Sequence, residues 1–285
     1  MSIKPEDKIK VALVGNSDPR TSLQEVYDIK EILEKLGLDV ILSPTLQENT
    51  LFNADKKAEI MNQYFADDSI GAIFDISGGD IANGVLDKLD YSLIRKQKKK
   101  FYGYSDLTTV LNSLISQSEQ KVELFQVATL LWDVSGKQID KFKSSFFDGS
   151  KDLYQTSWEF FQGSEIKGEV IGGNIRCFLK LAGTKYMPDL TNKILFLESQ
   201  GGGKESLYSM FYQIKGLEDF DKVAGILLGT FTFYQKNYEQ PIEEVLQRIL
   251  QDDDLPIAKT EEIGHGANSN ALKLGEYIRI SCNIG

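Results

Sequence analysis

The chain has 285 residues and a net charge of −10, because 42 Asp and Glu residues outnumber 32 Lys and Arg residues. Its 41% hydrophobic and 26% charged residues are typical of a globular protein and exclude a disordered, collagen-like or coiled-coil chain. An acidic chain with one short basic cluster, at residues 95–100, offers little attraction to phosphates, which argues against nucleic-acid binding.

The first half alternates short apolar runs with amphipathic segments, a pattern typical of a parallel sheet covered by helices. We expect strands at residues 9–15, 38–42, 71–77 and 100–104, and helices at residues 23–36, 54–67, 86–96 and 107–115. Between about residues 133 and 167 the periodicity weakens and glycines interrupt it, so we place a domain crossover there.

The second half is predicted to continue with helices and strands in another order. We expect helices at residues 175–182, 206–215 and 241–250, and strands at residues 193–198, 223–228 and 272–280. The whole chain is therefore predicted to be an α/β protein with two domains, residues 1–165 and residues 166–285.

Cysteine usage and apolar stretches bear on the compartment. Two distant cysteines, Cys177 and Cys282, are too few for an extracellular disulfide framework. Residues 1–8 carry acids and no apolar run of signal-peptide length, and the longest weakly charged stretch, residues 223–234, is too short to span a bilayer. We therefore expect a cytoplasmic protein with no membrane segment.

The most informative local pattern is Gly103-Tyr104-Ser105-Asp106-Leu107, where a predicted strand gives way to a predicted helix. Such a turn pushes a serine hydroxyl outward, as in a nucleophile elbow, although Leu107 stands where the usual second glycine would be. Alternatively, Ser105 and Asp106 cap the helix by accepting hydrogen bonds from its first turn.

A nucleophilic serine needs a base to take its proton, and a carboxylate usually orients that base. The single imidazole, His265, lies in a glycine-flanked loop, and Glu198 ends an apolar strand where parallel sheets place active-site groups. The alternatives are a loop histidine without a role and a solvated acid.

Backbone N–H groups in glycine-rich turns can stabilise an oxyanion. The turn at residues 77–80 offers the N–H of Gly79, and the N–H of Asp106 follows the serine, although a plain tight turn is the alternative. Residues 201–205 do not match a phosphate-binding loop, and one His with two remote Cys gives no zinc set. We expect neither a metal nor an organic cofactor.

Several motifs in the same order resemble the LD-carboxypeptidase family of serine peptidases. The resemblance spans nearly the whole chain and rests on residues 7–12, 72–74, 78–79, 89–91, 102–108, 172–174, 183–190, 193–198 and 264–266. It implies Ser105 as nucleophile, His265 as general base and Glu198 as the group that orients it. It also implies a flavodoxin-like N-terminal domain, a β-rich α+β C-terminal domain, an active site between them and a homodimer.

Departures around the glycine pair make the chain look closer to the microcin-immunity-like branch of that family. There an aromatic side chain stacks on the substrate, a role that would fall to Trp158 or Phe160, although Trp158 could equally belong to the core. We predict Asp80, Trp158 and Asn174 as substrate-binding residues. The expected substrate is a murein tetrapeptide or an aminoacyl nucleotide, and the alternatives are an esterase or a catalytically silent binding protein.

Overall fold

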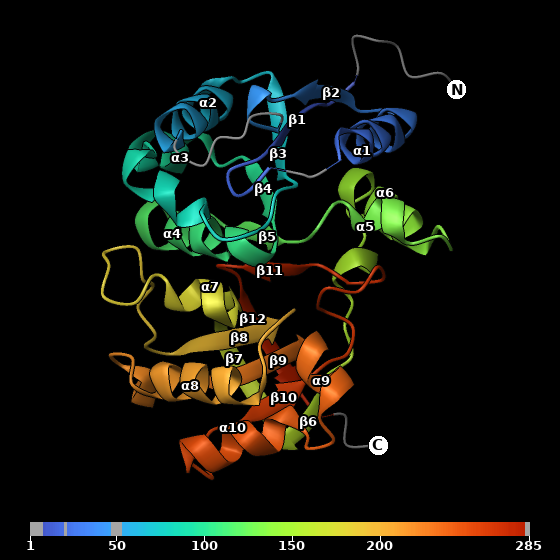
Figure 1. Ribbon diagram of the computed structural model, residues 1–285. Helices are drawn as coiled ribbons and strands as arrows, with labels where there is room; N and C mark the ends of the chain where they lie inside the picture. The colour runs from blue at the N-terminus through green and yellow to red at the C-terminus, as the bar shows by residue number, and fades with distance from the viewer. Residues whose placement is uncertain (1–7, 20–21, 47–52, 283–285) are drawn as a thin grey trace.

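The computed structural model describes residues 8–19, 22–46 and 53–282. Figure 1 shows two sheets one above the other, each of six strands, with α4, α7 and β11 between them. The predicted α/β class and two-domain arrangement are confirmed. Within the described residues, every helix is too short or too polar to cross a bilayer.

The first sheet has the strand order β11-β5-β4-β3-β1-β2. Five strands run parallel, and β11 pairs antiparallel with β5. Its strands are β1 (Lys10–Val14), β2 (Asp39–Leu42), β3 (Ile70–Asp75), β4 (Lys100–Gly103), β5 (Val122–Leu124) and β11 (Leu272–Leu274). β1 lies between β2 and β3, and the loops that follow β1 and β3 lie against each other at the carboxyl ends of the strands, where the Ser17 N–H donates to the Ser77 hydroxyl at 2.8 Å.

Helices cover both faces of this sheet. One face packs against α1 (Leu23–Lys35) and α6 (Lys137–Phe147), and the other against α2 (Ala54–Ala66), α3 (Tyr91–Gln97) and α4 (Thr108–Ser118). The alternation of β1 explains this, since Val11 and Leu13 face one cluster while Ala12 and Val14 face the other.

The second sheet has the strand order β12-β7-β8-β9-β10-β6, with parallel pairing from β7 through β10 and antiparallel β12 and β6 at the edges. Its strands are β6 (Glu159–Gln162), β7 (Glu165–Asn174), β8 (Lys193–Ser199), β9 (Gly225–Phe231), β10 (Ile257–Lys259) and β12 (Tyr277–Ser281). The accompanying helices are α7 (Ile175–Leu179), α8 (Lys204–Lys215), α9 (Thr232–Asn237) and α10 (Ile242–Leu250).

Three predicted elements differ from the structure. Residues 86–96 do not form one helix: a 3₁₀ segment, Ala82–Lys88, ends before extended Leu89, and Asp90 caps α3 by accepting from the Leu93 N–H at 3.0 Å. The crossover region contains α6, in which Ile139, Phe142 and Phe146 recur at helical spacing, although glycines at residues 136 and 149 flank the helix. Residues 272–280 form two strands, because Gly275 turns the chain with φ +76°.

Each sheet contains strands from both sides of the predicted boundary at residue 165. β6 precedes that boundary yet pairs with β10, and β11 lies far beyond it yet pairs with β5. The division at residues 165 and 166 stays a prediction, but the pairing shows that each sheet is completed by strands from elsewhere in the chain.

Candidate active site

Ser105 lies in a sharp turn between β4 and α4. Its φ of +56° is left-handed, a conformation that non-glycine residues rarely adopt outside constrained turns. Gly103 permits the turn, because a Cβ at that position would lie only 2.9 Å from the Leu107 Cβ. The strand, strained turn and helix are the arrangement expected of a nucleophile elbow.

The helix-cap alternative does not fit the Asp106 side chain. Neither the 3₁₀ turn Ser105–Leu107 nor α4 has a side-chain cap at its N-terminal residue. The Asp106 carboxylate instead accepts hydrogen bonds from the Ser17 hydroxyl at 2.6 Å and the Ala82 N–H at 2.8 Å. Asp106 therefore ties its turn to two other loops.

Glu198 and His265 lie together in the second half of the chain. The carboxylate Oε2 is 2.7 Å from the imidazole Nδ1, and Glu198 is completely buried. This burial excludes the solvated-acid alternative. His265 is also shielded, with only 11% of its side chain exposed, so its loop holds the ring inside the protein rather than in solvent.

Asn174 holds the other side of the same carboxylate. It ends β7 and lies beside Glu198 of β8 in the parallel register, and its Nδ2 donates to Glu198 Oε1 at 3.0 Å. Its backbone N–H donates to the Thr108 hydroxyl at 2.9 Å, which links β7 to the start of α4. Both carboxylate oxygens of Glu198 thus have a polar neighbour, which fixes the group behind His265.

Tyr104 connects the serine turn to His265. The tyrosine and imidazole rings meet edge to face, with centroids 5.1 Å apart. Burial, with a further contribution from the Glu198 charge, raises the pKa of Tyr104 well above its ordinary value, so its hydroxyl stays protonated. The residue preceding Ser105 therefore packs directly on the predicted base. Sequence reasoning missed Tyr104, because nothing local marks a tyrosine as the neighbour of a remote histidine.

The predicted oxyanion turn lies in the loop after β3. Gly79 has φ +130°, and a Cβ there would overlap the Asp18 carboxylate, so only glycine fits. Its carbonyl accepts from Arg176 at 3.1 Å, and the next N–H, that of Asp80, donates to Asp18 at 3.2 Å. The conformation of this loop is thus held from both sides.

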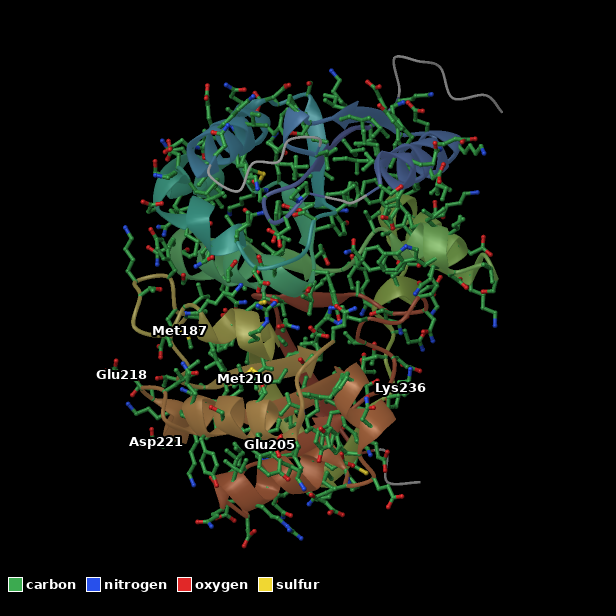
Figure 2. All side chains as sticks on the ribbon, in the orientation of Figure 1. Met187, Glu205, Met210, Glu218, Asp221 and Lys236 are labelled. Atoms are coloured by element: carbon green, nitrogen blue, oxygen red, sulfur yellow. The ribbon has the colours of Figure 1, made fainter. Side chains whose placement is uncertain are left out.

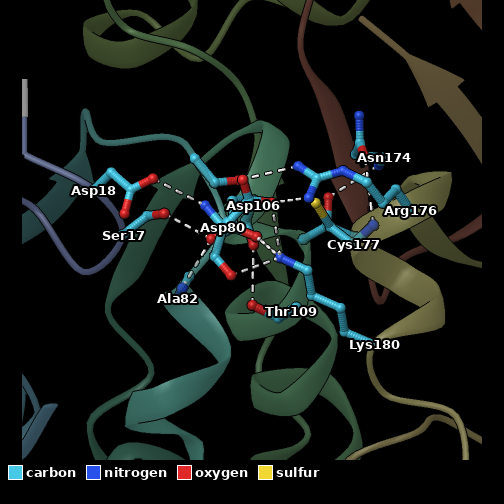
Figure 3. Close-up of polar contacts among 12 residues, drawn as sticks. Ser17, Asp18, Asp80, Ala82, Asp106, Thr109, Asn174, Arg176, Cys177 and Lys180 are labelled. Atoms are coloured by element: carbon cyan, nitrogen blue, oxygen red, sulfur yellow. Dashed lines mark hydrogen bonds and ion pairs between the residues drawn. The ribbon is translucent and has the colours of Figure 1, made fainter. Parts of the chain in front are cut away.

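Asp80 is placed close to the site but is engaged by the protein itself. Its carboxylate forms ion pairs with Arg176 and Lys180, as Figure 3 shows. Both cations lie at α7, from the C-terminal half. The sequence marked Asp80 as a substrate-binding residue, and the structure adds these two cations, which carried no recognisable motif.

Trp158 is not brought to the Glu198–His265 pair. It packs edge to face on Phe196 at 6.5 Å and lines a cavity of about 980 Å³ together with Phe160 and residues of β12. Ser105, Glu198 and His265 do not line that cavity. The contact with Phe196 and the hydrophobic cluster corresponds to the core alternative for Trp158.

The fold and the site together define a two-domain α/β protein with an imidazole–carboxylate pair beside a strained serine turn. In the described residues, no group of three His, Cys, Asp or Glu side chains is placed to hold a metal ion. The model of the LD-carboxypeptidase N-terminal domain matches residues 11–123, and that of the C-terminal domain matches residues 167–280. The chain belongs to the LD-carboxypeptidase family of serine-type peptidases.

The named relatives carry two kinds of name, murein peptide carboxypeptidase and microcin self-immunity protein. A Bacillus subtilis protein named "Probable murein peptide carboxypeptidase" is 28% identical, with 85% of this chain and 80% of that protein covered. The microcin C7 self-immunity protein MccF of Escherichia coli is 23% identical, with 88% of this chain and 83% of that protein covered.

Two solved structures with similar names resemble this chain in fold. An MccF structure without ligand has a TM-score of 0.84 at 21% identity and covers 95% of this chain and 92% of that chain. A muramoyltetrapeptide carboxypeptidase from Oxalobacter formigenes has a TM-score of 0.81 at 17% identity and covers 97% and 96%. Both share the fold described above.

Proposed function

We propose that this chain is a serine carboxypeptidase that hydrolyses an amide bond of a small peptide or aminoacyl conjugate through an acyl-enzyme. Ser105 is the nucleophile, His265 the general base and Glu198 the carboxylate that orients it. The observation that carries the proposal is the buried Glu198 carboxylate 2.7 Å from His265, whose ring packs on the residue preceding Ser105.

In the first half-reaction, His265 Nε2 takes the Ser105 proton while the serine oxygen attacks the scissile carbonyl. The developing oxyanion is stabilised by the N–H groups of Gly79 and Asp106. The C–N bond then breaks, and His265 gives its proton to the leaving amine. In the second half-reaction, His265 takes a proton from water, the hydroxide attacks the acyl ester, and the proton returns to Ser105.

Glu198 stabilises the imidazolium at each of these steps and selects the tautomer that leaves Nε2 free for the serine. Asn174 donates to the far oxygen of Glu198 and thereby limits how the carboxylate can rotate. Support comes from an MccF structure described as an active-site mutant, in which a serine, an asparagine and a lysine are replaced by alanine. In this chain, Ser105 and Asn174 would be the corresponding serine and asparagine.

For the substrate we propose an aminoacyl nucleotide ahead of a murein tetrapeptide. MccF structures are described as complexes with glutamyl sulfamoyl guanosine and aspartyl sulfamoyl adenosine. The departures around the glycine pair, with Ser77 before it and Asp80 after it, support the same branch. The cytoplasmic location and the homodimer stay predictions.

The test is a pooled incubation of murein LD-tetrapeptide and a non-hydrolysable-phosphate aminoacyl nucleotide, followed by mass spectrometry. The wild type is compared with Ser105→Ala and with Ser206→Ala, an exposed serine on α8. We expect cleavage of the aminoacyl nucleotide by the wild type and Ser206→Ala, and a loss of about 10⁶-fold in Ser105→Ala. If D-alanine is released from the tetrapeptide and the aminoacyl nucleotide stays intact, the substrate is a murein peptide instead.

An organophosphonate separates a hydrolase from a catalytically silent binding protein, because only an activated serine reacts with it. Labelling of the wild type and none of Ser105→Ala is the expected result. A wild-type chain that stays unlabelled and cleaves neither substrate would refute the proposed function. Turnover of acyl esters without any amide turnover would favour an esterase.

A further inference from the structure

We infer that Asp106 and Lys180 form a positioning pair, which fixes the separation of the two N–H groups that stabilise the oxyanion. This inference rests on the proposed function, because it assigns Gly79 and Asp106 to the oxyanion hole. Neither side chain is proposed to touch the reacting atoms. The role is to hold the backbone of two loops, one after β3 and one after β4, at a fixed distance.

The Asp106 carboxylate is the common partner of three segments. It is completely buried, and it accepts hydrogen bonds from the Ser17 hydroxyl at 2.6 Å, the Ala82 N–H at 2.8 Å and the Lys180 ammonium at 2.5 Å. Ser17 follows β1, Ala82 follows the glycine turn, and Lys180 caps the C-terminus of α7. Figure 3 shows these partners converging on the one side chain.

The glycine turn is held by the same short helix that supplies Lys180. Lys180 also donates to the carbonyl of Asp80 at 2.9 Å, and Arg176 donates to the carbonyl of Gly79 at 3.1 Å. Two successive carbonyls of the turn are therefore tied to α7, while α7 is tied to Asp106. This closed chain of contacts fixes the Gly79 loop relative to the backbone of Asp106.

Charge explains why the tie needs a cation. A buried carboxylate without a cation is costly, whereas Lys180 beside it supplies a charge-assisted hydrogen bond. The neighbouring Cys177 thiol stays neutral and adds no further negative charge, because burial, with a contribution from Asp106, raises its pKa to about 12. Lys57 lies one step away, where its ammonium binds the Ser17 carbonyl at 2.7 Å. Lys180 is therefore the direct counter-ion.

The geometry matters because oxyanion donors work by being placed before the reaction. Removing one such donor typically lowers kcat by about 10² to 10³. If the tie between Asp106 and Lys180 is lost, the two loops separate or rotate, and the oxyanion is stabilised less while the ground-state substrate still binds. The expected signature is a lower kcat with KM nearly unchanged.

The experiment measures kcat and KM on an activated acyl ester, with the melting temperature as the check on folding. The variants are Lys180→Met, Lys180→Arg, and Asp106→Asn combined with Lys180→Met. The double variant removes both charges of the pair, so it avoids the unpaired carboxylate that could unfold the single variant. Lys236→Met is the matched control, because Lys236 lies exposed on α9, as Figure 2 shows.

We expect the double variant to fold and to lose at least about tenfold in kcat, with KM within about threefold of the wild type. Lys180→Arg should recover most of the rate, and Lys236→Met should match the wild type. A folded double variant with wild-type kcat would overturn the inference while leaving the proposed function intact. A variant whose KM rises by as much as its kcat falls would do the same. A wild type inert to both ester and organophosphonate would instead refute the proposed function, and the inference with it.

Discussion

The Ser105 backbone is the point at which local strain and proposed chemistry coincide. A left-handed φ at a serine is unfavourable by about 1 to 3 kcal/mol, so the surrounding contacts must enforce it. Here Tyr104 is buried against His265 on one side, and Asp106 is anchored by three segments on the other. The serine is thus held by its two neighbours rather than by its own side chain.

Glu198→Gln tests the role of the carboxylate at His265. The amide has nearly the same shape but neither stabilises an imidazolium nor enforces the required tautomer, so kcat should fall by about 10² to 10⁴. Steady-state ester hydrolysis measures the effect. Glu205→Gln is the control, since Figure 2 shows Glu205 on α8 and its side chain is exposed. A rate within twofold of the wild type would contradict the assignment.

The glycine pair provides a matched comparison of neighbouring positions. Gly79→Ala places a methyl group against Asp18 at a positive φ, whereas Gly78→Ala meets no atom within 4 Å. We expect Gly79→Ala to lower the free energy of unfolding by about 1 to 3 kcal/mol and to reduce kcat, and Gly78→Ala to do neither. Urea unfolding and ester hydrolysis check both. Equal effects of the two substitutions would remove the special role of Gly79.

Much of the candidate site was predictable, because the types of residue and their places in the predicted elements indicate their chemistry. A serine at a strand–helix junction, a single histidine and an acid at a strand end were all visible in the sequence. The contacts among them were not, since Asp106 and Lys180 lie 74 positions apart and Tyr104 meets a histidine from the other half of the chain. Such pairs depend on how the two sheets pack, which local patterns do not encode.

Among the elements, α4 has the most unusual environment. It is buried along nearly its whole length between the two halves. The side-chain amide of Asn112 pairs with the backbone of β7, as a neighbouring strand would do. The amide Nδ2 donates to the Gly172 carbonyl at 2.8 Å, and Oδ1 accepts the Gly172 N–H at 2.9 Å. The helix thereby satisfies backbone groups of β7 that lie near the site.

Asn112→Ala should therefore be strongly destabilising. It leaves both the N–H and the carbonyl of Gly172 buried without partners, and we expect a loss of about 2 to 4 kcal/mol in the free energy of unfolding. Urea denaturation measures this value. Asn237→Ala is the control, because Asn237 is exposed and its side chain donates to the Phe233 carbonyl within α9. A loss below about 1 kcal/mol would show that other groups or water replace the amide.

Apolar periodicity predicted the elements well, except where glycines lie close to the ends of a helix. The strand at 193–198 corresponds to β8, and the helix at 241–250 to α10, because both carry clear apolar patterns. The helix α6 was missed although Ile139, Phe142 and Phe146 recur at helical spacing, because the glycines at residues 136 and 149 that flank it are typical of a loop. Its buried Gln138 donates to the Ser269 carbonyl at 2.8 Å, a contact that the sequence does not reveal.

At the scale of the whole molecule, one hydrophobic cluster joins the two sheets. It includes Ile73 and Leu111 from the first half together with Ile171 and Leu195 from the second. A shared core predicts a single cooperative unfolding transition. The two tryptophans report on different parts of the chain, so in each single-tryptophan variant, retaining Trp132 or Trp158, fluorescence and far-UV circular dichroism should give the same urea midpoint. Within one variant, midpoints by the two methods that differ by more than about 0.5 M would show that the halves unfold separately.

Global stability should also depend on Glu123, which lies on β5 between β11 and β4 of the first sheet. One of its carboxylate oxygens is buried, and burial raises the pKa of Glu123 to about 7 against the attraction of Lys273. The folded state therefore keeps a proton that the unfolded chain releases near pH 4.5. This group favours the folded state most below that pH, and the benefit declines as the pH rises toward 7.

Glu123→Gln removes this titration. We expect the free energy of unfolding of the variant, relative to that of the wild type, to increase by about 2 kcal/mol as the pH rises from 5 to 8. Urea unfolding at several pH values measures the difference, with exposed Glu218→Gln as the control. A pH dependence that is unchanged in Glu123→Gln would assign it to other groups.

The pairing of β11 with β5 has a consequence for synthesis on the ribosome. β5 is made early, but the strand that covers its free edge is translated long after the second sheet has begun to emerge. During that interval the nascent first half carries an uncovered strand edge, to which another chain could add. The same segment of the chain delivers His265 shortly before β11. Residues 265–274 therefore bring both the imidazole and the strand that covers β5, so a chain that is only partly made lacks the closed first sheet and the imidazole–carboxylate pair alike.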